Sequence, residues 1–276
     1  MLDRVLLPID FSEQSMMMFD CAIDLKELGS KRITLLHVKQ GGKDVPREDK
    51  KKLESLVDRL HDAGFDASSV IREGDPSAII LEEADSEHVD IIIMASAGKG
   101  KAEELLIGSV SMGVIRHSSK PILIDKFPVM QVDGKVKGCR HGQHLFRHAL
   151  VSVDIPSCST NLEDVFQSLC KRGLKEATLL HIIDSAKFKI GDDSRFAYVK
   201  RMLDEMKVQI NSPCKIATHV HYGTTAYNIL ETIREVDPSI VVIGTKKSSY
   251  LRGMTLGTTT EEVVRKSPIP LIIVPC

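Results

Sequence analysis

The sequence predicts an α/β protein with two tandem doubly wound domains, each built on a five-stranded parallel sheet of Rossmann-like strand order 3-2-1-4-5. Three observations support this fold class. Short runs rich in Val and Ile alternate with longer segments of helical periodicity, which is typical of βαβ units with strands buried on both faces. The whole series occurs twice along the chain, and each copy has a glycine-containing loop directly after its fourth expected strand.

The duplication is visible as matched segments at constant spacing. Two pairs of segments lie 144 residues apart, namely RVLLPID (4–10) with HALVSVD (148–154) and RITLLHV (32–38) with EATLLHI (176–182). Two further pairs lie 149 residues apart, namely 80–96 with 229–245 and 107–124 with 256–273. The second copy therefore has about five extra residues between His181 and Gly223. These repeats predict a first domain at 1–126, a linker at 127–147 and a second domain at 148–276.

In the first copy, helices should connect the strands in strict alternation. The strands are expected near 4–10, 32–38, 68–73, 90–95 and 121–125, and the helices near 13–29, 47–64, 76–87 and 108–118. Ser12 is a suitable N-cap for the first helix, with the carboxylate of Glu13 in its first turn. Gly29 and Gly64 lie where C′ glycines end helices.

The second copy repeats this order after the linker. Its strands are expected near 148–154, 176–183, 215–221, 239–244 and 270–274, and its helices near 160–173, 193–210, 225–236 and 257–267. Within the linker, VMQVDGKVK (129–137) alternates around Asp133-Gly134, which predicts a two-residue hairpin.

Composition excludes several classes of protein. The net charge is -1 and aromatic residues make up 4% of the chain, without Trp, so we expect neither nucleic-acid binding nor a membrane-surface role. No apolar run approaches a membrane span, and the first residues enter a strand pattern without a signal-peptide layout, which favours the cytoplasm. The six cysteines lack CxxC spacing, so we expect reduced thiols rather than a disulfide framework.

Two segments of each copy should meet beyond the carboxyl ends of the strands, where doubly wound sheets bind ligands. One follows the first strand and contains Pro8, Ile9 and Asp10, or Ser152, Val153 and Asp154. The other runs from the fourth strand to the last helix, as MASAGKGKAEELLIGSVS (94–111) and IGTKKSSYLRGMTLGTTT (243–260). The two aspartates are short acceptors suited to a ribose hydroxyl or an adenine amino group.

The second of these segments favours phosphate. Gly98 and Gly108 let a ligand approach the backbone, and the helix opening at Gly108 offers N–H groups, hydroxyls and a positive helix end. The second copy supplies Gly244, Gly257, Thr258, Thr259 and Thr260, together with Lys246 and Lys247. A glycine pair before a helix is more often an ordinary turn, but here it recurs at the same spacing in both copies.

These residues resemble the universal stress protein family in its tandem form, whose nucleotide-binding members have Gly-x2-Gly-x9-Gly-Ser/Thr after the fourth strand. The first copy matches as Ala95-x2-Gly98-x9-Gly108-Ser109, with Ala at the first glycine. The second matches as Gly244-x2-Lys247-x9-Gly257-Thr258, with Lys at the second. Lys247 would either block the phosphates or complement their charge. The resemblance covers nearly all of both halves and omits the linker.

The resemblance implies a stress-response regulatory protein that binds ATP or AMP without strong catalysis, with Mg²⁺ accompanying ATP. The implied nucleotide-binding residues are Pro8, Ile9, Asp10, Val38, Met94, Ala95, Ala97, Gly98, Gly108, Ser109, Val110 and Ser111 in the first copy. In the second copy they are Val153, Asp154, Ile182, Ile243, Gly244, Lys246, Lys247, Gly257, Thr258, Thr259 and Thr260. It also implies pairing of the last strands, 121–125 with 270–274, within one chain, and homodimers of such chains.

Two other groups of residues have competing interpretations. Cys139, His141 and His144, with His148 nearby, have ligand types that hold zinc, but a solvated linker with dispensable histidines is favoured. His37 and His181 end equivalent strands, and without an adjacent nucleophile a structural or pocket-wall role is favoured over catalysis.

Two alternatives to a nucleotide-binding regulator remain at this point. A weak ATPase or phosphotransferase would need a metal ligand and a group that positions water, yet no Walker motif occurs. A scaffold with vestigial pockets is the other, because each copy lacks one glycine of the motif.

Overall fold

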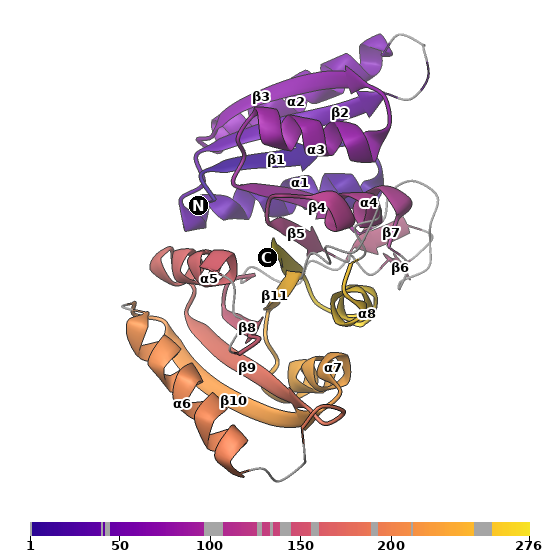
Figure 1. The fold of residues 1–276 in the computed structure, drawn as a ribbon. Helices are drawn as coiled ribbons and strands as arrows, with labels where there is room; N and C mark the ends of the chain where they lie inside the picture. Colours follow the sequence, from indigo (N-terminus) through magenta and orange to yellow (C-terminus); the bar gives the residue numbers. More distant parts are fainter. Residues whose placement is uncertain are drawn as a thin grey trace. The chain divides into compact units, whose positions relative to one another are not determined.

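The computed structural model describes residues 2–39, 41, 45–96, 107–125, 129–132, 135–138, 145–155, 160–188, 193–210, 212–245 and 256–276. The chain divides into unit 1 (Met1–Arg140) and unit 2 (His141–Cys276), and Figure 1 labels most of their helices and strands.

In unit 1, the described residues form a sheet of five parallel strands in the order β3-β2-β1-β4-β5. The strands are β1 (Arg4–Pro8), β2 (Arg32–Lys39), β3 (Asp66–Glu73), β4 (Ile91–Ala95) and β5 (Ile122–Asp125). The helices are α1 (Glu13–Asp24), a 3-10 turn at Leu25–Leu28, α2 (Arg47–Asp62), α3 (Pro76–Ser86) and α4 (Ser109–His117). The helices lie on both faces of the sheet (Figure 1), with α3 packed against α4.

Unit 2 repeats this architecture, with five parallel strands among its described residues in the order β10-β9-β8-β11-β12. The strands are β8 (His148–Ser152), β9 (Glu176–Asp184), β10 (Lys215–Gly223), β11 (Ile240–Thr245) and β12 (Leu271–Pro275). The helices are α5 (Thr160–Lys171), α6 (Asp193–Gln209), α7 (Thr225–Val236) and α8 (Thr258–Lys266). The predicted fold class, two doubly wound sheets of order 3-2-1-4-5, is therefore confirmed.

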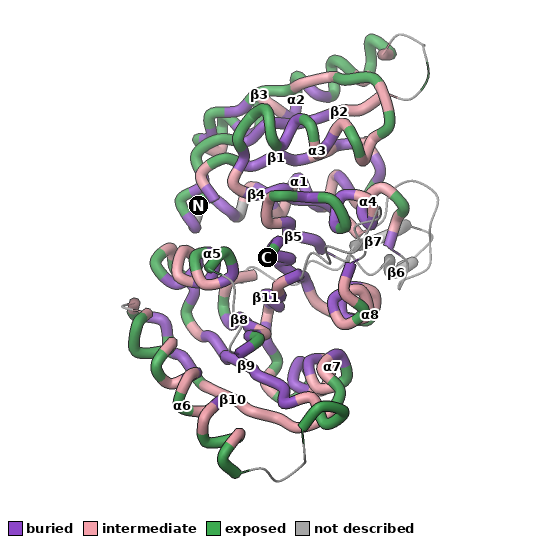
Figure 2. The backbone as a smooth tube through the Cα atoms, viewed as in Figure 1, coloured by how far each residue is buried: buried purple, intermediate pink, exposed green. Residues whose placement is uncertain are grey.

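The core of each unit follows from the Val- and Ile-rich strands. Ile91–Ile93 of β4 and Ile240–Val242 of β11 are buried, since helices cover both faces of the sheet. Figure 2 shows this burial along the central strands, whereas the outer turns of α2 and α6 are exposed. Apolar burial on both faces explains why these strands have continuous rather than alternating apolar residues.

The helix ends agree with the local sequence signals. The hydroxyl of Ser12 caps α1 by accepting a hydrogen bond from the N–H of Ser15 at 3.2 Å. Gly29 and Gly64 adopt φ of 77° and 83°, the left-handed conformation that ends a helix. The predicted first helix is wrong in its last turn, which tightens into the 3-10 turn at Leu25–Leu28 before Gly29.

A two-stranded antiparallel ladder precedes unit 2 in the chain. It joins β6 (Val129–Val132) to β7 (Lys135–Gly138), with Val132 opposite Lys135. This register leaves two residues for the loop, as expected for a hairpin at 133–134.

Candidate functional site

In each unit, the helix that follows the fourth strand begins with an open first turn, and the geometry is the same in α4 and α8. Gly108 and Gly257 are the N-cap residues of α4 and α8, with extended ψ angles of 153° and 139° and no side chain to cap the helix. Among the described residues, none accepts a hydrogen bond from the backbone N–H groups of 109–111 or 258–260. Three amides at the positive end of a helix form an arrangement suited to an anion.

A buried hydroxyl fastens each of these helix turns to the neighbouring strand. Ser111 donates from Oγ to the carbonyl oxygen of Ala95 at 3.0 Å, and Thr260 donates from Oγ1 to that of Gly244 at 3.2 Å. Both side chains are buried, and both bonds join residues 16 positions apart. The sequence suggested that these hydroxyls face an anion, but their protons are used within the protein. The backbone N–H groups are the donors that remain.

Solvent exposure changes in the same way from residue to residue along the first turns of α4 and α8. Ile107 and Leu256 are buried, Gly108 and Gly257 are half-buried, and Ser109 and Thr258 are exposed. Val110 and Thr259 are again half-buried. A ligand can therefore approach each turn from the solvent side at its first helical residue.

The ends of the first strands lie at the same edge of each sheet as these helix turns, because all five strands are parallel. Ile9 donates its N–H to Leu36 at 2.8 Å, and Val153 donates to Leu180 at 2.9 Å. The predicted strand over 4–10 ends at Pro8, and the chain turns away at Phe11, whose φ is 59°.

Asp10 belongs to a local turn that the sequence analysis did not anticipate. Its Oδ1 accepts hydrogen bonds from the backbone N–H of Ser12 at 2.9 Å and from the Ser12 hydroxyl. The spacing Asp-x-Ser is the signal for such an Asx-turn, so the pattern was readable in advance. Asp10 is half-buried, whereas its counterpart Asp154 is exposed.

The apolar residues expected to contact a base lie at or near the strand ends of this edge, and we call them the apolar floor. Ile9, Met94, Val153, Ile182 and Ile243 are buried. Pro8, Val38, Ala95 and Gly244 are half-buried at the ends of their strands.

Histidines fix the first strand ends in both units. Nδ1 of His37 lies 2.8 Å from the carbonyl oxygen of Ile9, and Nδ1 of His181 lies 2.9 Å from that of Val153. Nδ1 of His181 also lies 3.2 Å from the N–H of Ile155, so this ring contacts the backbone on both sides of Asp154. Burial lowers the pKa of His181. These contacts favour the structural role over a catalytic one.

Several predicted residues lie outside the described part of the chain: Ala97, Gly98, Lys246, Lys247, Cys139, His141 and His144. His148, considered with the zinc candidates, is instead a buried residue of β8 whose Nε2 lies 2.9 Å from Oγ1 of Thr178. Burial lowers the pKa of His148. Within the described ranges, no group of three His, Cys, Asp or Glu residues could hold a metal ion.

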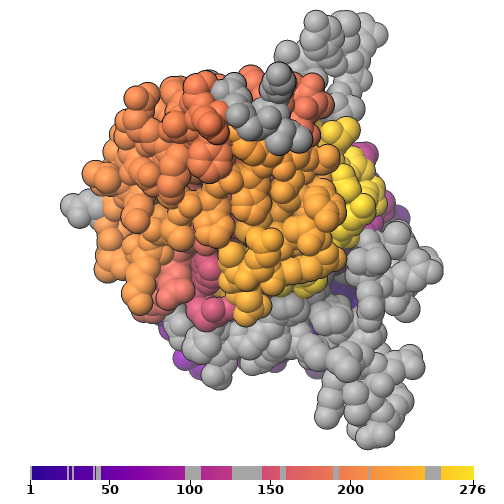
Figure 3. Space-filling model, turned by 90° about the horizontal axis from the view of Figure 1, so that it is seen from below, coloured from indigo at the N-terminus to yellow at the C-terminus, as the bar shows by residue number. Residues whose placement is uncertain are grey.

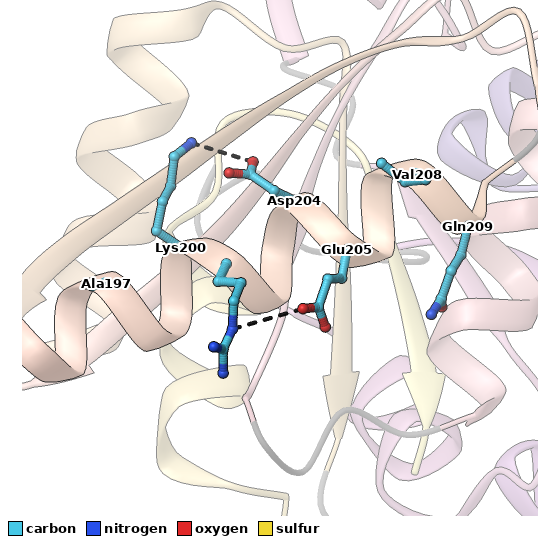
Figure 4. Close-up of a pocket in the computed structure, with 7 residues that line it drawn as sticks. Ala197, Lys200, Asp204, Glu205, Val208 and Gln209 are labelled. Carbon is cyan, nitrogen blue, oxygen red and sulfur yellow. Dashed lines mark ion pairs between the residues drawn. The ribbon is translucent and has the colours of Figure 1, made fainter.

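A separate groove follows the outer face of α6, and Figure 4 shows its side chains. In the view of Figure 3, α6 and α7, coloured orange, form much of the surface of unit 2. The groove has a volume of about 670 Å³ and is lined by Ala197, Lys200, Arg201, Asp204, Glu205, Val208 and Gln209. Lys200 pairs with Asp204 at 3.5 Å and Arg201 with Glu205 at 3.7 Å. These charges offset one another, so the groove offers a polyanion no net attraction, in contrast to the helix openings.

The fold and the repeated helix openings define the class: a tandem α/β protein with an uncapped helix N-terminus at the carboxyl edge of each doubly wound sheet. The model of the universal stress protein family matches residues 1–126 and, a second time, residues 145–275. The chain therefore belongs to the universal stress protein family.

Individual relatives agree with this assignment. Universal stress protein MJ0577 of Methanocaldococcus jannaschii is 31% identical over 155 residues, which cover 46% of this chain and 96% of the relative. Universal stress protein YxiE of Bacillus subtilis is 26% identical over 146 residues, covering 45% and 99%. Each therefore corresponds to one of the two repeats. The crystal structure of a universal stress protein from Archaeoglobus fulgidus has the same fold over 99% of this chain and 98% of its own, with a TM-score of 0.76 at 24% identity.

Among the described residues, no helix is both long enough and apolar enough to cross a bilayer.

Proposed function

We propose that the protein binds an adenine nucleotide, ATP or AMP, in each unit and acts as a stress-response regulator in the cytoplasm without strong catalysis. The observation that supports this most directly is the pair of helix openings at Gly108 and Gly257, whose amides have no acceptor among the described residues. Membership of the family that the helix-opening motif resembles supports it independently.

In this proposal, the nucleotide lies along the carboxyl edge of each sheet. Its phosphates accept hydrogen bonds from the amides of 109–111 or 258–260. Its base rests on the apolar floor that includes Met94 in unit 1 and Ile243 in unit 2. Asp10 and Asp154 are the carboxylates that we assign to the ribose or the adenine amino group. Mg²⁺ would bind chiefly through the phosphate oxygens of ATP, because the described residues offer no ready-made cluster of ligands.

The test places a competing carboxylate at each helix opening. Ser109 and Thr258 are exposed first residues of their helices, where a negative charge stabilises the helix. Ser109→Asp and Thr258→Asp should therefore stay folded while repelling phosphate. Titration calorimetry of the wild type with ATP and AMP should give two sites per chain. Each single variant should retain one, and the double variant none.

Ser109→Asn and Thr258→Asn are the matched controls, since they have nearly the same shape without the charge. They should bind nucleotide as the wild type does. The absence of any heat of binding to the wild type at millimolar ATP and AMP would contradict the proposal. A double Asp variant that binds as well as the wild type would move the site away from the helix openings.

The assembly of the protein is a further part of the proposal. We expect residues 121–125 and 270–274 to pair within one chain and whole chains to form homodimers. Sedimentation velocity at several protein concentrations measures the second expectation, and a purely monomeric species throughout would contradict it.

A further inference from the structure

Two buried cysteines come together at the edge of unit 2 where its strands begin, opposite the edge with the candidate nucleotide site. Cys170 lies in the last turn of α5, and Cys214 directly precedes β10. Their exposed fractions are 1% and 8%. The two thiols are close enough for each to shift the pKa of the other, although 43 residues separate them in the sequence.

Ser212 holds the backbone of both cysteines in place. Its hydroxyl donates to the carbonyl oxygen of Cys170 at 3.0 Å and accepts from the N–H of Cys214 at 3.2 Å. One side chain therefore fixes the separation of the two chain segments. The proximity of the thiols is a consequence of this local bridge as well as of general packing.

Unit 1 has different chemistry at the equivalent place. Position 26 corresponds to 170 at the repeat spacing of 144, and Phe65 precedes β3 as Cys214 precedes β10. There, Nζ of Lys26 lies 4.7 Å above the centre of the Phe65 ring, a cation–π contact. The fold is thus compatible with quite different residues at this place, so the thiol pair is a particular feature of unit 2.

The two thiols are not equivalent. Contact with Cys170 lowers the pKa of Cys214, while contact with Cys214, together with burial, raises the pKa of Cys170. Cys214 is also the more exposed of the two. Because an oxidant must reach the sulfur from solvent, Cys214, the more exposed thiol, is the residue that would react first.

We propose that Cys170 and Cys214 form a reversible disulfide when the protein meets hydrogen peroxide. In the first step, the sulfur of Cys214 attacks one peroxide oxygen, the O–O bond breaks, and Cys214 becomes a sulfenic acid as water leaves. In the second, the sulfur of Cys170 attacks the sulfur of Cys214, the S–O bond breaks, and a second water leaves. In total, two thiols and one hydrogen peroxide give one disulfide and two waters. A dithiol reductant reverses the change.

The primary test uses the full-length wild-type protein. It is treated with hydrogen peroxide, denatured, alkylated and digested, and the peptides are analysed by mass spectrometry without reduction. We expect the peptides of Cys170 and Cys214 to be joined, with the mass of two hydrogens lost, and dithiothreitol to separate them. The disulfide closes a long loop, so the unfolding midpoint of unit 2 should rise by roughly 5 to 10 °C.

Three variants complete the test. Cys170→Ala and Cys214→Ala should lose the peroxide-dependent rise in midpoint, whereas Cys21→Ala in unit 1 should keep it. The proposal fails if both Cys170 and Cys214 of the peroxide-treated wild type are still alkylated as free thiols after denaturation. It also fails if either is joined mainly to another cysteine or oxidised only to a sulfinic acid. These outcomes are measured on the wild type, so they do not depend on whether the variants fold.

Discussion

At the carboxyl edge of their sheets the two units have the same backbone arrangement, whereas the side chains around it differ. Ser111 and Thr260 make equivalent bonds to strand ends, 149 residues apart in the sequence. Beside the first strand, in contrast, His37 is half-buried and His181 is buried. At the opposite edge, a cation–π pair in unit 1 corresponds to a pair of thiols in unit 2.

This difference distinguishes what the backbone determines from what the side chains determine. A glycine N-cap followed three residues later by a hydroxyl gives an open helix turn in either sequence context, because the donors are backbone amides. The surrounding side chains then determine how each unit responds to pH and to oxidants. We therefore expect the units to share the type of ligand and to differ in stability under stress.

The largest expected effect comes from matched cavities in the two cores. Leu36 and Leu180 occupy equivalent, fully buried positions in β2 and β9. Leu36→Ala and Leu180→Ala should each cost about 2 to 5 kcal/mol of stability. Hydrogen exchange measured by mass spectrometry should rise in the unit that contains the substitution. If Leu36→Ala increased exchange equally in β2 and β9, the units could not be treated as separately folding bodies.

The second effect is a loss of stability in unit 2 at acid pH. Burial lowers the pKa of His148 and of His181 in the folded state below the ordinary 6.5. The unfolded chain therefore binds more protons, and stability falls as the pH drops below about 6.5. The slope is at most about 1.4 kcal/mol per pH unit for each histidine.

Urea unfolding between pH 7.5 and 5.5, followed by hydrogen exchange in β8 and β9, measures this slope. His148→Gln should reduce it, because glutamine does not titrate. His61→Gln, a substitution in unit 1, is the control and should leave the slope of unit 2 unchanged. If the stability of unit 2 did not change between pH 7.5 and 5.5, the expected loss at acid pH would be contradicted.

A smaller effect should be the same in both units. Ser111→Ala and Thr260→Val remove the hydroxyls that fasten α4 and α8 to the strand ends, and each should cost about 1 kcal/mol. Each should also weaken nucleotide binding by its own unit, since the amides lose their fixed position. Denaturant unfolding and calorimetry measure the two effects. Ser109→Ala, a control at an exposed position, should change stability by less than about 0.5 kcal/mol. If Ser111→Ala and Thr260→Val caused clearly unequal losses of stability, the shared hydroxyl bond would not be equally important in the two units.

The smallest effect concerns one position at which the two sites differ, Ala95 in unit 1 and Gly244 in unit 2. A Cβ on Gly244 would lie 2.8 Å from Sγ of Cys276, the far end of a side chain that can rotate. Gly244→Ala should therefore change stability by no more than about 1 kcal/mol. Adding Cys276→Ala should remove any loss. A loss of several kcal/mol in the single variant, measured by urea unfolding, would mean that the two strand ends are not equivalent.

The sequence was sufficient for the fold because the relevant signals are local and repeated. Continuous apolar runs, Ser12 as a cap and the glycines at 29 and 64 each have one physical interpretation, and the structure agrees with them. The positions of Gly108 and Gly257 as N-caps followed from the same reasoning. The ends of the strands were harder to predict: the strand expected over 4–10 ends at Pro8, and the chain turns at Phe11, whose φ is 59°.

The tertiary contacts of individual side chains could not be predicted in the same way. A serine at the third helical position can donate to a ligand or to the protein, and only the position of Ala95 decides for Ser111. His148 was expected at the start of a strand and was considered with the zinc candidates of the linker, but nothing in the sequence indicated that its ring is buried against Thr178. Cys170 and Cys214 looked unrelated because no spacing rule connects residues on a helix end and a distant strand.

The duplication has a consequence for assembly that follows from covalent linkage alone. Residues 126–147 join β5 of one unit to β8 of the next, so each unit always has exactly one tethered neighbour. A short tether holds that neighbour at an effective concentration on the order of millimolar, far above what separate chains would reach by diffusion in a cell. Any association between the two halves is thus insensitive to expression level, and both binding positions are synthesised in a fixed one-to-one ratio.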